Sequence, residues 1–197
     1  TIDGIIYSLQ RHGGITVYFN ELLHRLKFRS AGDCRVVIHE GSAANVDFLP
    51  AGHEIRPMRL AERYRRCPLR TQDGLFHSSY YRLPDRNVPV VTTVHDFIYE
   101  RFASGPRKWL HSWQKFAAIN SSHAVICISE STRRDLLHFL PDIRPERLHV
   151  VHNGVSSAFH PLMPEMLSST TMRPYVLFVG ARSGYKNFMP LVQAVHA

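Results

Sequence analysis

Two neighbouring glycines near the start of the chain have a type and spacing that suit anion binding. Gly13 and Gly14 follow residues 1–6, which read as the end of a first strand, and an amphipathic helix begins directly after them. A paired glycine at such a joint lets the backbone approach a ligand closely, and the free N–H groups of the helix start can hold an anion. A plain tight turn explains the pair equally well, so both interpretations stay open at this point.

Polar side chains also follow two later apolar runs. Residues 88–94 are typical of a buried strand, and His95 and Asp96 come directly after them. Residues 74–77 form a shorter strand-like run, which ends in a histidine and is followed by two serines and two tyrosines. Ligands of open α/β sheets bind at the carboxyl ends of the strands. The side chains expected at that edge are those of His77, Tyr80, Tyr81, His95 and Asp96.

The stretch 124–155 predicts the kind of sheet that would position these side chains. It opens with an apolar run rich in β-branched residues, as expected of a strand that is buried on both faces. Ser129 suits a helix N-cap, leucines then recur at helical spacing, and Pro141 ends the helix before a second strand-like run at 148–151. A strand, a helix and a strand with short joints form a βαβ unit, and such units build parallel sheets with right-handed crossovers.

Further periodic segments fit the same architecture. Apolar residues between positions 15 and 26 recur at i, i+3, i+4 and i+7, which predicts an amphipathic helix, and 34–39 reads as a strand. Residues 107–121 predict a helix with an aromatic face, which we expect to pack in the core. That face consists of Trp109, Leu110, Trp113, Phe116, Ala117 and Asn120. The expected fold class is α/β, a Rossmann-like parallel sheet with helices on both faces.

Length and composition indicate a globular protein of one domain or slightly more. The 197 residues are 44% hydrophobic and 20% charged, and no apolar run approaches the roughly 20 residues that span a bilayer. The 3 cysteines are widely spaced and fit neither a disulfide framework nor a zinc site, so we expect reduced thiols in a cytoplasmic protein. The 13 histidines show no metal-ligand spacing, so no metal is expected.

The net charge of +8 favours anionic partners, and its densest part lies between Arg56 and Arg70. A solvated loop or helix face is the simplest explanation of this segment. A surface for acidic lipid headgroups or for a phosphate-bearing substrate is the alternative. Nucleic acid is not expected, because neither a helix-turn-helix nor an aromatic platform accompanies the arginines.

The composition changes towards the C-terminus. Residues 1–160 are assigned to a first domain, and residues 161–173, rich in proline, serine and threonine, to a linker. Residues 175–179 read as a new buried strand, followed by a polar glycine-bearing loop and the start of a helix. A lone strand and helix cannot bury a core, so 174–197 is expected to be the start of a second, incomplete domain.

In order and spacing, these segments resemble the glycosyltransferases of family 4, which have the two-lobed GT-B fold. The matching motifs are R-H-G-G-I-T-V-Y, F-H-S-S-Y-Y-R-L-P, T-T-V-H-D-F, I-C-I-S-E-S-T-R-R-D-L, V-V-H-N-G-V and Y-V-L-F-V-G-A-R-S-G-Y-K-N-F, and they cover nearly the whole chain. The resemblance implies a retaining transfer of a sugar from a nucleotide-sugar donor to an acceptor, without a bound metal. It also implies that the first lobe mostly holds the acceptor and the second lobe the donor.

The resemblance further assigns roles to individual residues. The N–H groups of Gly13 and Gly14 would reach the donor phosphates, and His95 would face the transferred sugar. Asp96 would orient this histidine or a sugar hydroxyl. The side chains expected to line the acceptor are His77, Tyr80 and Tyr81, because aromatic rings with hydroxyls suit sugars. The pair expected to neutralise the diphosphate as the leaving group gains charge is Arg182 and Lys186.

For the molecule as a whole, we expect a hexosyl-type glycosyltransferase that acts on a glycan or lipid-linked acceptor of the bacterial cell envelope. It would be cytoplasmic, with a peripheral contact to anionic membrane through the segment from Arg56 to Arg70. Because most of the second lobe is missing, this chain alone should turn over little, and the strand at 175–179 could mediate self-association. The alternative is a non-catalytic module of the same fold that binds phosphate or sugar.

Overall fold

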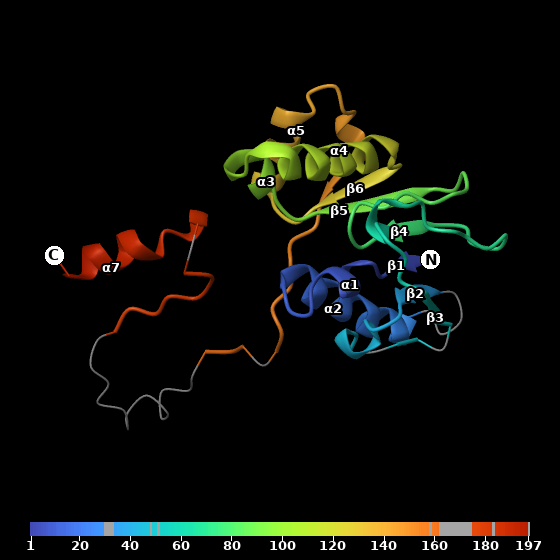
Figure 1. Ribbon diagram of the computed structural model, residues 1–197, viewed down its shortest axis with the longest axis horizontal. Helices are drawn as coiled ribbons and strands as arrows, with labels where there is room; N and C mark the ends of the chain where they lie inside the picture. The colour runs from blue at the N-terminus through green and yellow to red at the C-terminus, as the bar shows by residue number, and fades with distance from the viewer. Residues whose placement is uncertain are drawn as a thin grey trace. The chain divides into compact units, whose positions relative to one another are not determined.

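The computed structural model of the chain describes residues 1–29, 34–47, 49–50, 52–157, 159–161, 175–182 and 184–196. They belong to two compact units, Thr1–Asn153 and Gly154–Ala197. The first unit is built on a seven-stranded parallel sheet (Figure 1). Its strands are β1 (Ile2–Asp3), β2 (Val36–His39), β3 (Glu54–Arg56), β4 (Phe76–Ser78), β5 (Val90–Val94), β6 (Ala124–Cys127) and β7 (Leu148–Val150).

The order of the strands across the sheet is β3-β2-β1-β4-β5-β6-β7, and every neighbouring pair is parallel. The chain therefore begins in the middle of the sheet, runs outward to β3, and returns with β4 to the other side of β1. This reversal between β1 and β4 is the topological switch point, where ligands of open α/β sheets bind. The predicted fold class, a Rossmann-like α/β sheet, is confirmed.

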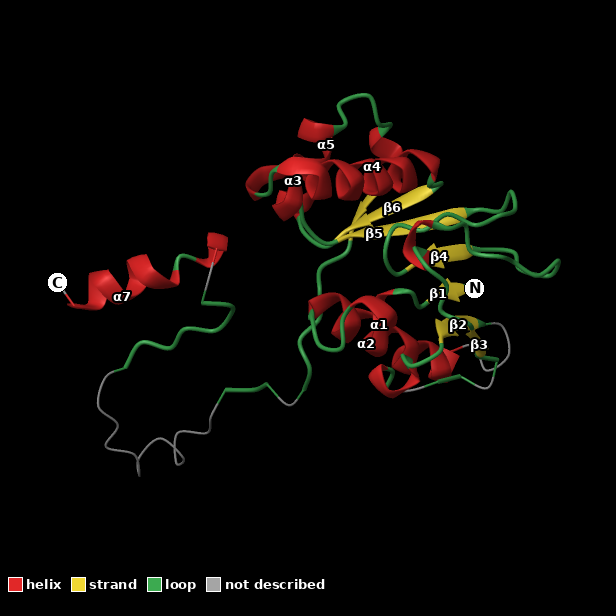
Figure 2. Cartoon of the chain, viewed as in Figure 1, coloured by secondary structure: helices red, strands yellow, loops and turns green. Residues whose placement is uncertain are grey.

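Helices cover both faces of this sheet (Figure 2). On one face, α1 (Ile6–Leu9) and α2 (Gly14–Arg29) pack on β1 and β2. On the other face, α3 (Ile98–Phe102), α4 (Gly105–Ser121) and α5 (Glu130–Phe139) lie over β5, β6 and β7. All four residues of β2 are buried, which explains why a central parallel strand reads as a continuous apolar run.

Most of the predicted elements of the first unit are confirmed. The strands expected at 34–39, 74–77 and 88–94 correspond to β2, β4 and β5, and the helix expected from position 15 corresponds to α2. Helix α5 begins where its cap predicts, because Ser129 Oγ accepts a hydrogen bond from the backbone N–H of Thr132 at 3.1 Å. The helical structure in the arginine-rich segment is a short 3-10 turn, η2 (Glu62–Tyr64).

Helix α4 is present. The prediction that its aromatic face packs in the core is confirmed for Phe116, which lies partly buried against the core, and is wrong for the other large side chains of that face. Trp109, Leu110 and Trp113 are 79%, 44% and 64% exposed. The residues that α4 buries instead are His111, Gln114, Lys115, Ala118 and Ile119. Three of these side chains are polar and bind groups beneath the helix, and these contacts set its rotation.

The second unit contains η4 (Gly184–Lys186) and α7 (Phe188–His196). The strand predicted at 175–179 is wrong, because the structure gives these residues no strand pairing with any described segment. A strand needs a neighbour to satisfy its backbone N–H and C=O groups. The predicted linker, 161–173, falls almost wholly outside the described residues. Among the helices that are described, none has the length and apolar character of a bilayer span.

Candidate active site

The candidate site lies at the carboxyl end of β5, beside the start of α2. His95 is the first residue after β5, and its ring meets that of Tyr18 edge-on, with ring centroids 5.1 Å apart. Tyr18 stands one turn after Gly14, which is the first residue of α2. Side chains on a helix lean towards its N-terminus, so Tyr18 reaches back over the first turn. The fold thereby brings His95 to the same end of α2 as Gly13 and Gly14.

His95 is held as a neutral imidazole. Its backbone carbonyl accepts a hydrogen bond from Thr132 Oγ1 at 3.2 Å, which ties the end of β5 to the first turn of α5. Burial outweighs the opposing field of Asp96 and, together with Lys115, lowers the pKa of His95 to about 4. Among the described residues, none makes a hydrogen bond with its buried Nε2. A buried polar atom without a partner is costly, so a ligand hydroxyl that bonds to Nε2 would be favoured.

His77 lies within β4 and not at the end of that strand. In β4 it pairs with Val91 of β5, and its Nε2 lies 2.9 Å from Thr93 Oγ1 in a hydrogen bond. The hydroxyl of Tyr18 lies 3.5 Å from the same threonine oxygen. Burial, reinforced by His95, lowers the pKa of His77 to about 4. His77 and Tyr18 thus share a contact with Thr93, and the contact of His77 with an acceptor stays a prediction.

The segment after β5 is anchored by a buried ion pair. Lys115, whose side chain is 1% exposed, donates from Nζ to Glu100 Oε2 at 2.8 Å and to the carbonyl of Asp96 at 2.7 Å. Burial opposes ionisation of Glu100, but His111 and Lys115 outweigh it and lower its pKa to about 2. Asp96 itself is exposed, and its Oδ1 accepts a hydrogen bond from the N–H of Ile98 at 3.0 Å. The backbone that carries His95 and Asp96 is therefore fixed from two sides.

Aromatic side chains gather beside this anchor. Tyr80 and Tyr81 follow β4 with ring centroids 5.2 Å apart, and His111 lies 5.9 Å from the first and 5.8 Å from the second. Tyr99 stacks on His111 at 4.1 Å. Tyr81 is buried and Tyr80 only half-buried, so Tyr80 keeps more surface for an acceptor. Tyr81 adopts a left-handed φ of 57°, which costs about 1 kcal/mol or more and is concentrated at functional sites.

Arg63 adds a cation to this aromatic group. Its guanidinium carbon lies 4.9 Å from the ring centroids of both Tyr64 and Tyr80. Gln114 of α4 fixes the backbone there, since its Nε2 donates to the carbonyl of Arg63 at 2.6 Å. A guanidinium over tyrosine faces can serve ligands that carry hydroxyls or negative charge.

The two glycines at the start of α2 differ in their surroundings. A Cβ atom on Gly13 would come within 2.7 Å of the Gln10 side chain, whereas one on Gly14 would meet nothing within 4 Å. Neither residue has a positive φ, so the backbone conformation does not require glycine here. A tight turn therefore does not explain why glycine occupies both positions. The open backbone at Gly14, at the start of a 16-residue helix, can approach an anion instead.

A buried ion-pair network underlies the neighbouring rim at β1 and β2. Arg82, which is 1% exposed, donates to Asp3 Oδ1 at 3.1 Å and to Glu62 Oε1 at 2.8 Å. His39 Nε2 lies 3.5 Å from the same oxygen of Glu62. Burial raises the pKa of Asp3 to about 6, although Arg82 opposes the shift. The network ties the ends of both strands, where Asp3 and His39 stand, to the turn that carries Arg63.

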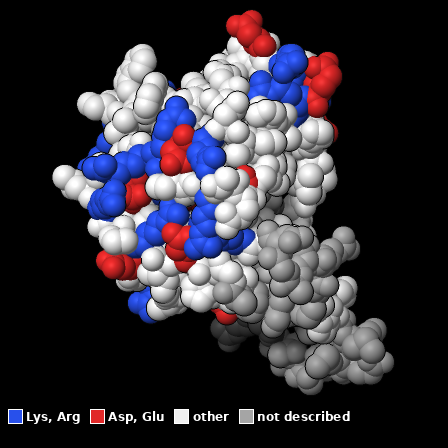
Figure 3. Space-filling view, turned by 90° about the vertical axis from the view of Figure 1, so that its right-hand side faces the viewer, with Lys and Arg blue, Asp and Glu red and all other residues white. Residues whose placement is uncertain are grey.

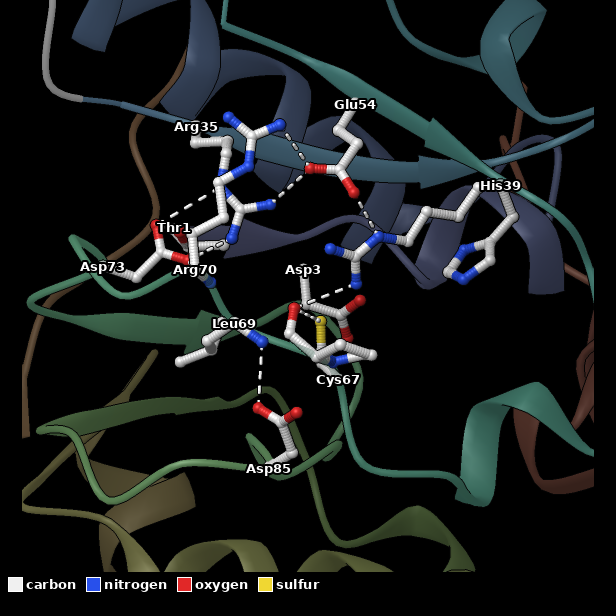
Figure 4. A network of polar contacts seen from close by, with 12 residues as sticks. Thr1, Asp3, Arg35, His39, Glu54, Cys67, Leu69, Arg70, Asp73 and Asp85 are labelled. Carbon is white, nitrogen blue, oxygen red and sulfur yellow. Dashed lines mark hydrogen bonds and ion pairs between the residues drawn. The ribbon is translucent and has the colours of Figure 1, made fainter.

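The segment between Arg56 and Arg70 is largely occupied by contacts within the protein. The Glu54 carboxylate lies 2.9, 2.5 and 2.8 Å from nitrogens of Arg35, Arg56 and Arg70 (Figure 4). Figure 3 shows a face where Lys and Arg side chains are grouped with Asp and Glu side chains among them. Such pairing leaves less positive charge for an external anion.

Arg182 and Lys186 belong to the second unit. The guanidinium carbon of Arg182 lies 5.4 Å from the ring centroid of Phe188, and Lys186 Nζ lies 5.0 Å from that of Tyr185. Both cations are exposed, and their role at a diphosphate stays a prediction. In the described part of the chain, no three His, Cys, Asp or Glu side chains form a group that could hold a metal ion.

Four residues of the site were missed from the sequence: Tyr18, Arg63, Glu100 and Lys115. Tyr18 falls within the apolar periodicity of the helix predicted between positions 15 and 26, although a hydroxyl one turn after the glycine pair is a usable signal. Arg63 was counted only as one of many arginines. No local signal marks the ion pair of Glu100 and Lys115, because its members stand 15 positions apart in different helices.

Comparison with known proteins adds a family and three relatives. The sequence pattern of Glycosyltransferase Family 4 matches residues 12–159. An alpha-maltose-1-phosphate synthase of Mycolicibacterium smegmatis is 34% identical over 93 residues, which are 43% of this chain and 24% of that protein. Two proteins of the same name from Mycobacterium tuberculosis strains are 27% identical over 122 residues, which are 56% of this chain and 32% of each protein. The chain thus spans between a quarter and a third of the length of these relatives.

Proposed function

The chain belongs to Glycosyltransferase Family 4, and on this premise we propose that it forms the acceptor-binding lobe of a retaining hexosyltransferase. The donor would be a nucleotide-sugar and the acceptor a glycan or a lipid-linked saccharide. The observation that carries the proposal is His95, a neutral imidazole at a strand end beside the start of α2, whose buried Nε2 has no hydrogen-bond partner among the described residues. A neutral imidazole can bond to a hydroxyl of the transferred sugar, while the backbone at Gly14 takes a donor phosphate.

The other residues have supporting roles in this proposal. Asp96, exposed beside His95, orients a sugar hydroxyl, and Tyr80, half-buried with Arg63 against its ring, borders the acceptor. Arg182 and Lys186 of the second unit neutralise the charge that develops on the departing nucleotide diphosphate. These two cations would supply the stabilisation for which other transferases use a metal, so no metal is needed.

Several features of the whole molecule stay proposals. We place it in the cytoplasm, and the 197-residue chain alone is expected to bind its donor weakly because it supplies little of the donor lobe. Self-association through 175–179 stays a proposal, supported by the exposed apolar side chains of Tyr175, Leu177 and Val179. Peripheral contact with anionic membrane through the segment from Arg56 to Arg70 is an untested prediction that does not belong to this proposal, because Glu54 pairs with the arginines at both ends of the segment.

The test is a transfer screen with the gene product that contains this chain. Nucleotide release is measured for a series of nucleotide-sugars, with and without acceptors, and the anomeric configuration of the product is determined. The acceptor panel includes sugar phosphates, because the relatives are named for a product that carries phosphate. Turnover of at least one donor with retained configuration is expected. Binding of a sugar or phosphate without any turnover would favour the non-catalytic module instead.

A further inference from the structure

Helix α4 has polar side chains on its buried face and apolar side chains on its solvent face, the reverse of an ordinary surface helix. Its buried face is polar around the middle of the helix, from His111 to Lys115, where Gln114 and Lys115 bond to the segments of Arg63 and Glu100. Its outward face in the N-terminal half is apolar. The outward residues are Pro106, Trp109, Leu110 and Trp113, at i, i+3, i+4 and i+7. This spacing places all four on one side of the helix.

The exposure of this outward face is large for side chains of its kind. Trp109 is 79% exposed and Trp113 is 64% exposed. Aromatic side chains of this size normally bury about 150–250 Å² each and dominate cores and interfaces. The polar contacts of Gln114 and Lys115 prevent α4 from turning its tryptophans inward. An apolar stripe that the fold itself holds in solvent marks a binding surface.

The charged side chains of α4 are all cations. Arg107 and Lys108 lie in the first turn of α4, and the helix contains no acidic residue. Cations at this end oppose the helix dipole, by about 0.3–1 kcal/mol each, so the local fold gains nothing from them. Their position directly before Trp109 provides a cationic border to the aromatic stripe.

We propose that the outward face of the N-terminal half of α4 docks on the surface of an anionic lipid bilayer. Tryptophan settles at the interface between headgroups and acyl chains, because its ring is apolar and its N–H is polar. Arg107 and Lys108 attract the anionic headgroups. A stripe of this kind beside cations is the pattern of helices that lie in the interface. A second copy fits less well, since a two-fold contact would bring these cations against each other without an acid on α4 to pair them.

The two tryptophans on this face make the test direct, because they are the only tryptophans in the 197 residues. Their fluorescence is followed while the chain is titrated with vesicles of phosphatidylcholine, with or without phosphatidylglycerol. We expect a blue shift, and quenching by brominated lipid, with the anionic vesicles. An unshifted spectrum on these vesicles overturns the proposal. A shift that appears without lipid as protein concentration rises would identify a second copy as the occupant and also overturn it.

Two matched double variants locate the contact. Arg107→Gln with Lys108→Gln keeps both tryptophans and should weaken vesicle binding about 25-fold, at about fivefold for each cation. Arg59→Gln with Leu60→Ser changes an exposed cation and an exposed apolar residue in the segment from Arg56 to Arg70, and should leave binding unchanged. The opposite result would move the contact to that segment and refute the α4 face.

A third double variant, Trp109→Ser with Trp113→Ser, tests the aromatic stripe by co-sedimentation with the vesicles. Its binding should fall at least about tenfold, because two exposed rings lose their burial in the interface. Urea midpoints equal to that of the parent chain would show that each variant is folded. Binding is measured without any sugar transfer, so this proposal and the proposed function can fail separately.

Discussion

Acidification should destabilise the first unit through the two histidines of the candidate site. Burial lowers the pKa of His77 and of His95 from 6.5 to about 4 in the fold. The unfolded chain therefore binds protons at a higher pH than the folded chain does. The stability that the neutral rings contribute is complete above pH 6.5 and is lost as the pH falls from there towards 4.

The magnitude follows from these pKa values. Between pH 7 and pH 5, each of the two rings lowers the free energy of unfolding by about 2 kcal/mol. Asp3 acts in the opposite direction, because burial raises its pKa from 3.8 to about 6. Its protonation over the same interval raises the free energy of unfolding by about 1 kcal/mol. His39, whose pKa burial also lowers, adds to the loss, so the net change is a loss of at least roughly 2 kcal/mol.

The assay is urea unfolding at the two pH values, for the parent chain and for His95→Gln and His77→Gln. Each variant should lose about 2 kcal/mol less on acidification than the parent chain, whatever its stability at pH 7. His152→Gln is the matched control and should follow the parent chain, because its side chain is exposed in the fold. If His95→Gln loses as much as the parent chain, the imidazole is not buried in neutral form and the account of the rim is wrong.

Three further changes separate stability from function. Arg82→Met leaves the buried carboxylates of Asp3 and Glu62 without their cation, and urea unfolding should show a free energy of unfolding lower by about 3–5 kcal/mol. A loss below about 1 kcal/mol would contradict the network. In Gly14→Ala the added Cβ meets no neighbouring atom, so the free energy of unfolding should change by no more than about 1 kcal/mol while the KM for the nucleotide-sugar rises. An unchanged KM would argue against a phosphate at this backbone. Ser129→Ala removes the N-cap of α5 and should lower the free energy of unfolding by about 1 kcal/mol, and with it the melting temperature, while kcat stays unchanged. A melting temperature equal to that of the parent chain would show that the cap is dispensable.

The sheet was predictable because its signals are local. The strand β5 carries β-branched residues that are buried on both faces, and β6 carries the β-branched pair Val125 and Ile126. Ser129 caps α5 with a bond to a residue three positions away. Parallel pairing then follows from strand, helix and strand in succession. The edge at which His95 and Asp96 stand follows from the same rule, since it depends only on where β5 ends.

The orientation of α4 was not predictable from periodicity. The spacing of Trp109 and Trp113 indicates one face of a helix, but it does not say whether that face turns inward. Two polar contacts determine which face turns inward. Lys115 bonds to Glu100, at a separation of 15 positions, and Gln114 bonds to the backbone of Arg63, at a separation of 51 positions. Contacts between distant segments are not visible in a local pattern.

Two other failures have the same origin. The run 175–179 has the composition of a strand, but strand formation depends on a pairing neighbour, and no described segment supplies one. Arg82 is nearly always an exposed residue type, and only the fold reveals that Asp3 and Glu62 meet it in the interior. Both the missed burial of Arg82 and the wrongly predicted strand at 175–179 therefore depend on contacts between distant segments.

The most direct test of the central claim is the kcat of His95→Ala in the gene product that contains this chain, compared with the unaltered enzyme. If Nε2 of His95, which bonds to no described residue, binds the transferred sugar, kcat should fall at least about a hundredfold, the usual effect of removing one transition-state hydrogen bond. The urea midpoint at pH 7 should stay close to that of the parent protein. A kcat equal to that of the unaltered enzyme would show that the chemistry takes place elsewhere.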